Sequence, residues 1–292
     1  MGRLGDKVVI VTGSGQGIGE GIALAAAAEG AHVVCAGRTL EKVERTAATI
    51  RERGVKALAR QCDVRNREQV EAAVEAAAEC LGGLDVVVAN AGVAAQLPLV
   101  GGDPAVFERT IEVNLLGVYY TLRAAGPHIA HERGYALAIS SLAAALHPPL
   151  LGAYCASKAG VEALADSLRV ELYPSGARVG VAYFAELDTD MVRRGFGTAA
   201  AQRMGEVRRP GRRVAPLEVG IDAIERGIAR RARHVTAPRW VAPLLPMRML
   251  AQRAVEAATR SSIGGVLEIA LGENAPLSTP QPVASRDGRA QP

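Results

Sequence analysis

Three side chains in the middle of the sequence could move a proton: Ser141, Tyr154 and Lys158. Tyr154 and Lys158 are four residues apart in a segment with a helical pattern, so they share one face of the predicted helix. A free tyrosine has a pKa of about 10, but a nearby ammonium favours the phenolate and lowers that pKa. Ser141 ends an apolar run thirteen residues before Tyr154. Together they predict a general acid–base site, although the Tyr-x-x-x-Lys spacing alone also fits an ordinary helix face.

A glycine-rich segment near the N-terminus could hold phosphate groups. Thr12–Gly19 (TGSGQGIG) follows a β-branched apolar run and precedes an Ala-rich segment. Glycine lets a ligand approach the main chain closely, and the first N–H groups of a helix attract anions. This strand–loop–helix context predicts a site for a dinucleotide pyrophosphate rather than a plain tight turn.

The elements that must position these groups alternate along the chain. The predicted strands are Lys7–Thr12, Ala31–Ala36, Lys56–Cys62, Leu84–Asn90, Tyr135–Ser140, Arg178–Phe184 and, as a weaker last one, His234–Ala237. The predicted helices are Ile18–Glu29, Leu40–Arg53, Arg67–Leu81, Phe107–His131, Ala153–Leu172 and Glu218–Arg233. Strands that are continuously apolar indicate a parallel sheet covered on both faces. We therefore predict an α/β, doubly wound Rossmann-type sheet in a single domain with a C-terminal extension, with ligands at the carboxyl ends of the strands.

Short motifs in chain order resemble those of the short-chain dehydrogenase/reductase family. They are the TGSGQGIG segment, Asp63-Val64, Asn90-Ala91-Gly92, Asn114 in VNLLG, and Ser141 followed by Tyr154-x-x-x-Lys158. The resemblance covers about residues 5–192 and is specific, because these motifs occur in the family's order and spacing.

The resemblance implies a role for each reacting residue. Tyr154 would protonate the carbonyl oxygen during reduction, or accept the hydroxyl proton during oxidation. Lys158 would also hold the nicotinamide ribose, and Ser141 would position the carbonyl and stabilise developing charge. Asn114 would hold a water that links Lys158 to solvent. No metal is implied, because the cofactor carries the hydride chemistry.

The resemblance also implies the cofactor contacts, which come from the loops after the first, second, third, fourth and sixth strands and from the catalytic helix. The expected residues are Gly13, Ser14, Gly15, Gln16, Gly17, Ile18, Gly19, Arg38, Thr39, Asp63, Val64, Asn90, Ala91, Gly92, Tyr154, Lys158 and Thr189.

The end of the second predicted strand bears on which nicotinamide cofactor binds. Gly37 stands where an acidic residue would bond the adenosine ribose of NAD, and Arg38 follows it. The missing acid leaves room for a 2′-phosphate, which a guanidinium binds in fork geometry and to which Thr39 could add a contact. We therefore predict NADP(H) rather than NAD(H). The alternative is that Arg38 is a solvated residue at the start of a helix.

One motif departs from the family pattern. The family usually has Pro-Gly after the sixth strand, whereas this chain has Phe184-Ala185, and Thr189 keeps the place of the residue expected at the nicotinamide carboxamide. Without proline the loop backbone is less constrained.

Two aliphatic segments are expected to border the substrate: residues 142–153 (LAAALHPPLLGA) and Gln96–Val100. Their character favours an apolar ketone, aldehyde or secondary alcohol over a sugar or a charged acid. His147 is the titratable group among them, and we expect a rim or structural role for it rather than a catalytic one.

Charge is unevenly distributed in this 292-residue chain. The formal net charge is +4, but residues 190–260 hold 15 Arg, no Lys and 6 acidic residues, a balance of +9. We predict a catalytic domain over 1–238, a helical extension over 239–272 and a disordered tail over 273–292. For the Arg-rich region we favour a solvated surface with a helix capping the pocket. Peripheral membrane contact through Trp240–Leu250 is a weaker alternative, and nucleic-acid binding is weaker still.

Composition excludes several classes of protein. A hydrophobic fraction of 49% with 22% charged residues is typical of a folded domain, not a disordered chain. We expect no signal peptide and no transmembrane helix, because the N-terminus lacks a charged-then-apolar leader and no run of ~18 apolar residues occurs. The four cysteines lack metal-binding spacing, which favours reduced thiols. These features predict a cytoplasmic protein.

The sequence thus predicts an NADP-dependent oxidoreductase that acts on CH–OH or C=O groups of an apolar small molecule. The alternative is a catalytically silent NADP(H)-binding regulatory or scaffold protein with the same fold. The presence of Asn114, Ser141, Tyr154 and Lys158 argues against that alternative. The resemblance also implies a homodimer or homotetramer built on the segments Phe107–His131 and Ala153–Leu172.

Overall fold

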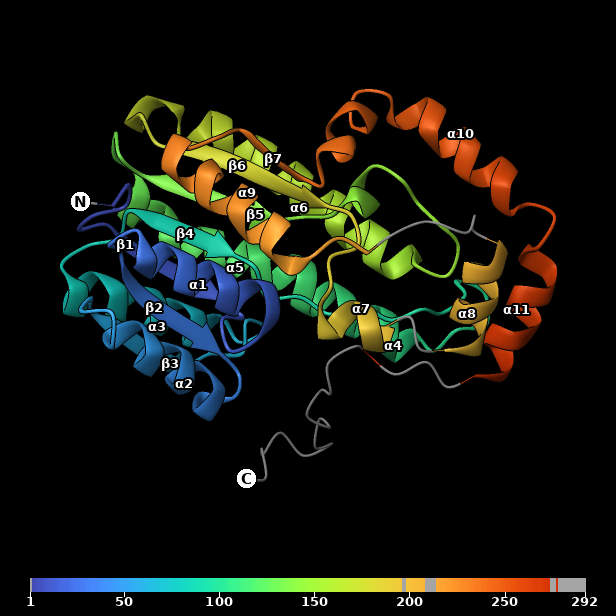
Figure 1. The fold of residues 1–292 in the computed structure, drawn as a ribbon, viewed down its shortest axis with the longest axis horizontal. Coiled ribbons are helices and arrows are strands. Elements are labelled where there is room, and N and C mark those ends of the chain that lie inside the picture. The colour runs from blue at the N-terminus through green and yellow to red at the C-terminus, as the bar shows by residue number, and fades with distance from the viewer. Residues whose placement is uncertain (1, 196–197, 208–213, 274–276, 278–292) are drawn as a thin grey trace.

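The centre of the molecule is a seven-stranded parallel sheet, seen in a computed structural model that describes residues 2–195, 198–207, 214–273 and 277 (Figure 1). The strand order is β3-β2-β1-β4-β5-β6-β7. The strands are β1 (Val8–Thr12), β2 (His32–Gly37), β3 (Ala57–Gln61), β4 (Val86–Ala89), β5 (Tyr135–Ile139), β6 (Arg178–Phe184) and β7 (His234–Ala237). The predicted doubly wound sheet is confirmed, including the weak last strand.

Two apolar cores lie on opposite faces of the sheet. Along β1, Val8 and Ile10 belong to one core and Val9 and Val11 to the other, as the alternation of side chains in a strand requires. One face is covered by α1 (Gly17–Ala28), α2 (Leu40–Arg51) and α9 (Leu217–Arg230). The other is covered by α3 (Arg67–Leu81), α5 (Gly117–Ile129) and α6 (Gly152–Glu171). Burial on both faces explains the runs of apolar residues in the central strands β1, β4 and β5.

The helix predicted over Phe107–His131 is not continuous, and this prediction was wrong in detail. The structure has α4 (Pro104–Ile111), a π-helical turn (Glu112–Leu116) and then α5. The helical pattern runs through all three pieces, so periodicity alone does not reveal the wider turn. The π-turn carries Asn114, which is fully buried.

The C-terminal part forms a separate arm beside the sheet (Figure 1). After β6 come α7 (Asp190–Gly195) and α8 (Ala199–Val207), and after β7 a 3-10 segment (Arg239–Leu244), α10 (Arg248–Thr259) and α11 (Ile263–Gly272). α11 packs along α8, so the extension returns to the segment that follows β6. Of the predicted tail 273–292, all but Glu273 and Leu277 lies outside the described residues. Among the helices described, none is long and apolar enough to cross a membrane.

Candidate active site

The glycine loop between β1 and α1 lines a cleft of about 250 Å³ at the carboxyl edge of the sheet. Gly13 (φ +71°) and Gly17 (φ +60°) adopt backbone conformations that favour glycine. A Cβ on Gly19 would overlap the main-chain oxygen of Gly13. The Asn90 amide donates to the Thr12 carbonyl over 2.9 Å and so fixes the loop from β4. The result is a bare main-chain surface at the start of α1.

Most of the predicted loop residues line this cleft, and Ser14 is the exception. Ser14 is fully buried, and its hydroxyl donates to the Ala36 carbonyl over 3.3 Å. Its own carbonyl accepts a 3.0 Å hydrogen bond from Thr46. The side chain therefore connects the loop to β2 and α2 instead of facing a ligand, and its predicted cofactor contact has no support from the geometry.

The end of the cleft predicted to hold the adenosine is lined by Gly37 at the end of β2 and by Arg38 and Thr39 just before α2. Burial lowers the pKa of the Arg38 guanidinium, against the attraction of Asp63. Thr39 occupies the N-cap position of α2 without a capping side-chain bond. Lys42 also lines the cleft, with its ammonium donating to the Gln16 amide oxygen over 2.7 Å. Lys42 was not among the predicted contacts, although a basic residue four positions after Arg38 was a signal.

Asp63 and Val64 line the cleft after β3, as predicted. The Asp63 carboxylate accepts three hydrogen bonds from the Arg65 guanidinium, at 2.6, 3.0 and 3.1 Å. Burial acts to raise the pKa of Asp63, but these bonds outweigh it and the pKa is lowered. Asp63 is therefore ionised and already paired within this part of the cleft.

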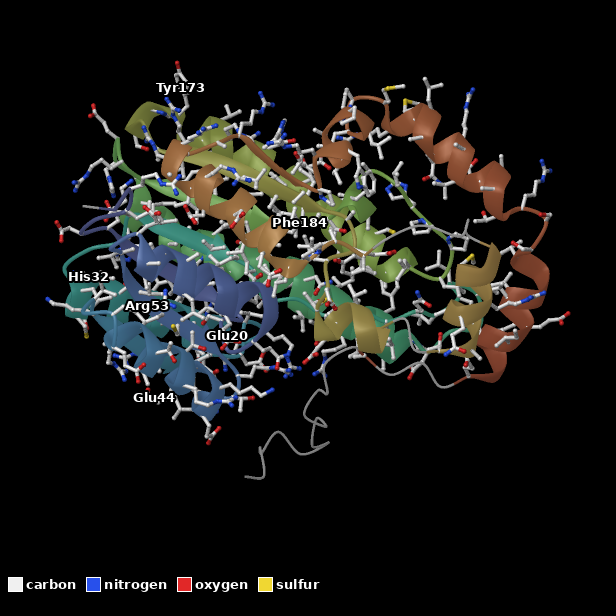
Figure 2. The ribbon with its side chains drawn as sticks, in the orientation of Figure 1. Glu20, His32, Glu44, Arg53, Tyr173 and Phe184 are labelled. Atoms are coloured by element: carbon white, nitrogen blue, oxygen red, sulfur yellow. The ribbon has the colours of Figure 1, made fainter. Side chains whose placement is uncertain are left out.

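At the end of the cleft predicted to hold the nicotinamide, Asn90, Ala91 and Gly92 line the cleft together with Thr189. The Thr189 hydroxyl accepts from the Val192 N–H over 3.3 Å at the start of α7. Phe184 and Ala185, the residues that replace Pro-Gly, lie at the end of β6 and also line the cleft; Figure 2 shows Phe184 where the sheet meets the C-terminal arm. The Ala185 N–H donates to the Ala237 carbonyl over 3.0 Å, so the β6–β7 ladder continues without the proline.

Ser141 and Tyr154 meet where the cleft adjoins a second cavity of about 160 Å³. The Ser141 hydroxyl donates to the Phe184 carbonyl over 3.4 Å, and its proximity to the Tyr154 phenol acts to lower the pKa of Tyr154. Burial raises the pKa of Tyr154 to about 12, against the expected lowering by an ammonium. The phenol is therefore protonated at neutral pH, the state that an acid needs.

Lys158 follows Tyr154 by one turn of α6 and is 3% exposed. Its ammonium donates to the Ile139 carbonyl at the end of β5 over 2.8 Å, and it lies 5.7 Å from the centre of the Tyr154 ring. Burial lowers the pKa of Lys158 to about 8. The ammonium is thus held beside the phenol by the strand end, and it can release its proton much more readily than a solvated lysine.

The Asn114 side chain is bound within the protein. Its amide oxygen accepts from the Val93 N–H over 2.8 Å, and its amide nitrogen donates to the Val93 carbonyl and to the Ser157 hydroxyl. A Cβ on Gly92 would lie 3.4 Å from the Asn114 oxygen and 3.6 Å from the Lys158 nitrogen. Asn114 therefore braces the loop that faces Lys158, and its part in a water relay stays a prediction.

The second cavity is largely apolar. Its lining consists of Ala94, Ser141, Leu142, Ala143, Leu146, Pro148, Leu151, Tyr154, Phe184, Ala185, Glu186, Met191, Val192 and Val255. The segment after Ser141 borders it as predicted, but Gln96–Val100 does not. His147 is also outside the lining, and its main-chain N–H donates to Gln252 on α10. Val255 comes from the extension, and no local motif in the sequence marked it.

The chain is similar to known dehydrogenases and reductases. A family model described as short chain dehydrogenase matches residues 7–203. A (-)-trans-carveol dehydrogenase from Rhodococcus erythropolis is 34% identical over 208 residues, which span 66% of this chain and 75% of that protein. A glycine betaine reductase from Emericella nidulans is 38% identical over 206 residues, 70% of this chain but only 16% of that much longer protein.

Solved structures have the same architecture. A putative short-chain alcohol dehydrogenase from Sinorhizobium meliloti is 31% identical, with a TM-score of 0.71 over 80% of this chain and 95% of that one. An alcohol dehydrogenase from Thermococcus sibiricus, complexed with 5-hydroxy-NADP, is 28% identical, with a TM-score of 0.68 over 79% and 95% of the two chains. A Mycobacterium paratuberculosis enzyme bound to NAD is 25% identical, with a TM-score of 0.71 over 80% and 97%. The chain belongs to the short-chain dehydrogenase/reductase family, as an oxidoreductase of alcohols or carbonyls that uses a nicotinamide cofactor.

Proposed function

We propose that this protein transfers a hydride between NADP(H) and an apolar ketone, aldehyde or secondary alcohol. The observation that carries the proposal is the meeting of Ser141 and Tyr154 at the junction of the cofactor cleft and the apolar cavity. A carbonyl oxygen bound at that junction would accept hydrogen bonds from both hydroxyls. The nicotinamide supplies or accepts the hydride when it is bound.

During reduction, Tyr154 donates its phenolic proton to the substrate oxygen as the carbonyl carbon is reduced. Ser141 stabilises the charge that develops on that oxygen. Lys158 lies beside the phenol, and its ammonium favours the phenolate that remains and would return a proton to it. In the oxidation direction the same proton moves back from the alcohol to Tyr154.

The residues of the cleft fit a dinucleotide. Neighbouring atoms leave no room for a Cβ at Gly13 or Gly19, so these positions are glycine. No side chain therefore covers the main-chain N–H groups at these positions, which could bind a pyrophosphate. At the adenosine end, Arg38 and Lys42 line the cleft, and Asp63 is bound to Arg65. A 2′-phosphate would thus meet positive charge, which supports NADP(H) over NAD(H).

Tyr154→Phe tests the proposed reaction. We expect it to lower kcat for reduction of an apolar ketone by at least ~10²-fold, because the proton donor is gone, while the Kd for NADPH changes by less than about twofold. The measurements are NADPH oxidation over a panel of carbonyls and fluorescence titration with NADPH. If the wild type binds NADPH but turns over no member of the panel, the catalytically silent alternative takes the place of this proposal.

The assembly and location of the protein remain predictions. A homodimer or homotetramer would use the outer faces of α5 and α6; Tyr119 of α5 and Leu116, the last residue of the π-turn before it, are about two-fifths exposed. Sedimentation velocity of the full chain tests this, and a monomer at all concentrations would contradict it. We also propose a cytoplasmic location.

A further inference from the structure

The extension supplies part of the wall of the cavity that adjoins Tyr154. Val255, near the middle of α10, lines that cavity together with Leu146 and Pro148 of the β5–α6 loop and with Met191 and Val192 of α7. Val255 is far along the chain from these groups, so its place depends on how the arm is attached. Three attachments fix it.

The first attachment is an ion pair between α10 and α6. The Arg248 guanidinium donates to both carboxylate oxygens of Glu162, at 2.7 and 3.3 Å. The side chain of Glu162 is only 12% exposed, so it is partly shielded from water. The pair holds the first turn of α10 against the helix that carries Tyr154 and Lys158.

The second attachment joins α10 to the loop that borders the cavity. The Gln252 amide oxygen accepts the His147 N–H over 2.8 Å, and its amide nitrogen points to the His147 carbonyl at 3.5 Å. Glu256, one turn further on, accepts from the same amide nitrogen over 3.1 Å. Gln252 lies three residues before Val255 on the same face of α10, so this attachment sets the position of the Val255 side chain over the cavity.

The third attachment closes the arm on the far side. Both carboxylate oxygens of Glu273 accept N–H groups at the start of α8, from Ala199 at 2.6 Å and Ala200 at 3.0 Å. Leu150 of the β5–α6 loop packs with Met204 of α8 and Val266 of α11 in a small apolar cluster. The extension therefore spans from α6 to α8 across the cavity.

We propose that α10 is the specificity element of this site, and that Val255 sets the length of apolar chain that an aliphatic ketone or secondary alcohol can place beyond the reacting carbon. This inference rests on the proposed function. Each methylene that gains or loses burial changes binding by about fourfold, so the wall position should appear as a chain-length optimum. It also gives the Arg-rich region a local task, because Arg248 holds the wall in place.

The test uses a series of methyl ketones from 2-butanone to 2-nonanone with NADPH and the full-length protein. Val255→Trp should lower kcat/KM for the longest ketones by at least about tenfold and leave 2-butanone within about twofold. Val255→Ala should move the optimum to longer ketones. Ala257→Trp is the matched control, because Ala257 is exposed on α10 about 200° around the helix from Val255 and should keep the wild-type profile.

Two results overturn the inference. One is an unchanged length profile in both Val255 variants, and the other is an equal loss in Val255→Trp and Ala257→Trp. A separate measurement does not need turnover: the binding of the matching secondary alcohols to the protein–NADPH complex is measured by calorimetry. The alcohol and NADPH are both already reduced, so no hydride transfer takes place between them. If no ketone reacts but Val255→Trp still weakens binding of the longer alcohols, the proposed function is wrong, whereas the role of Val255 in limiting chain length is supported. If the Val255→Trp substitution leaves the dependence of alcohol binding on chain length unchanged, Val255 does not set the chain length and the inference is wrong.

Discussion

The cofactor cleft and the substrate cavity share Ser141 and Tyr154 but are built from different kinds of contact. The cleft lies at the ends of the central strands: β1, β4 and β5 are buried at every position and joined by main-chain ladders. The outer wall of the cavity is α10, where Thr259 alone is buried and Met249 is 81% exposed. Polar side chains hold that helix in place. The first region is fixed by backbone geometry, whereas the second can exchange its side chains without loss of the fold.

The largest effect should follow from a change in the loop backbone. Gly19→Ala places a Cβ on the Gly13 carbonyl, so we expect the affinity for NADPH to fall by about 100-fold or more. Fluorescence titration measures this affinity. Gly126→Ala is the control, because a Cβ there meets nothing within 4 Å and should stabilise α5 slightly. If Gly19→Ala bound NADPH with wild-type affinity, the loop would be able to shift, and backbone geometry would not fix the cofactor cleft.

The buried ammonium should give a pH-dependent effect on stability. The folded-state pKa of Lys158, about 8, lies below the ordinary value of 10.5, so the ammonium opposes folding below pH 8. This cost is removed as pH rises from 8 to 10.5. Relative to Lys158→Met, the wild type without cofactor should gain up to about 3 kcal/mol of unfolding free energy between pH 7 and 10. Denaturant unfolding measures the gain.

Lys56→Met is the control for that series, because Lys56 is exposed and its removal should leave the pH dependence unchanged. A constant difference between wild type and Lys158→Met across this pH range would show that the ammonium is well solvated.

A smaller effect should separate the two nicotinamide cofactors. Arg38→Ala removes a guanidinium from the adenosine end, and we expect about tenfold weaker NADPH binding with NADH binding changed by less than about twofold. Arg45→Ala, on the exposed side of α2, should change neither affinity. Equal affinities of the wild-type protein for NADPH and NADH would reject the NADP(H) preference.

The smallest effect on stability should come from the arm. Arg248→Met breaks the pair with Glu162, and because the arginine is 43% exposed we expect a loss of at most about 1 kcal/mol in unfolding free energy. The KM for the apolar ketone should rise several-fold while the Kd for NADPH is unchanged, because α10 borders only the substrate cavity. Arg253→Met, exposed on the same helix, is the control. A changed NADPH affinity would show that the two regions are not independent.

The sequence predicted the cleft well because its signals are local. Strand periodicity, glycine spacing and the one-turn separation of Tyr154 from Lys158 each lie within a few residues, and the sheet then brings the strand ends together. The cofactor contact of Ser14 stays a prediction, because its residue type and motif position do not show that its hydroxyl donates to the Ala36 carbonyl. The protonated state of Tyr154 was missed because burial, which spacing cannot reveal, has the larger effect on its pKa.

The cavity was predicted less completely because its parts meet only through long-range contacts. The aliphatic segment after Ser141 was found, but Gln96–Val100 was expected at the substrate and Val255 was not. The π-turn at Asn114 was hidden within a continuous helical pattern. A helix capping the pocket was the favoured interpretation of the Arg-rich region. Its position over the cavity, however, depends on a contact between Gln252 and His147, which are more than a hundred residues apart in the sequence.

The carboxylate of Glu273 at the start of α8 has a consequence for the order in which the protein is assembled. Chains fold from the N-terminus as they are synthesised. All the strand ends that form the cofactor cleft precede residue 190, whereas Val255 and Glu273 leave the ribosome much later. A nascent chain can therefore complete its nucleotide-binding half before its substrate cavity has an outer wall, and bound cofactor would stabilise the half that forms first.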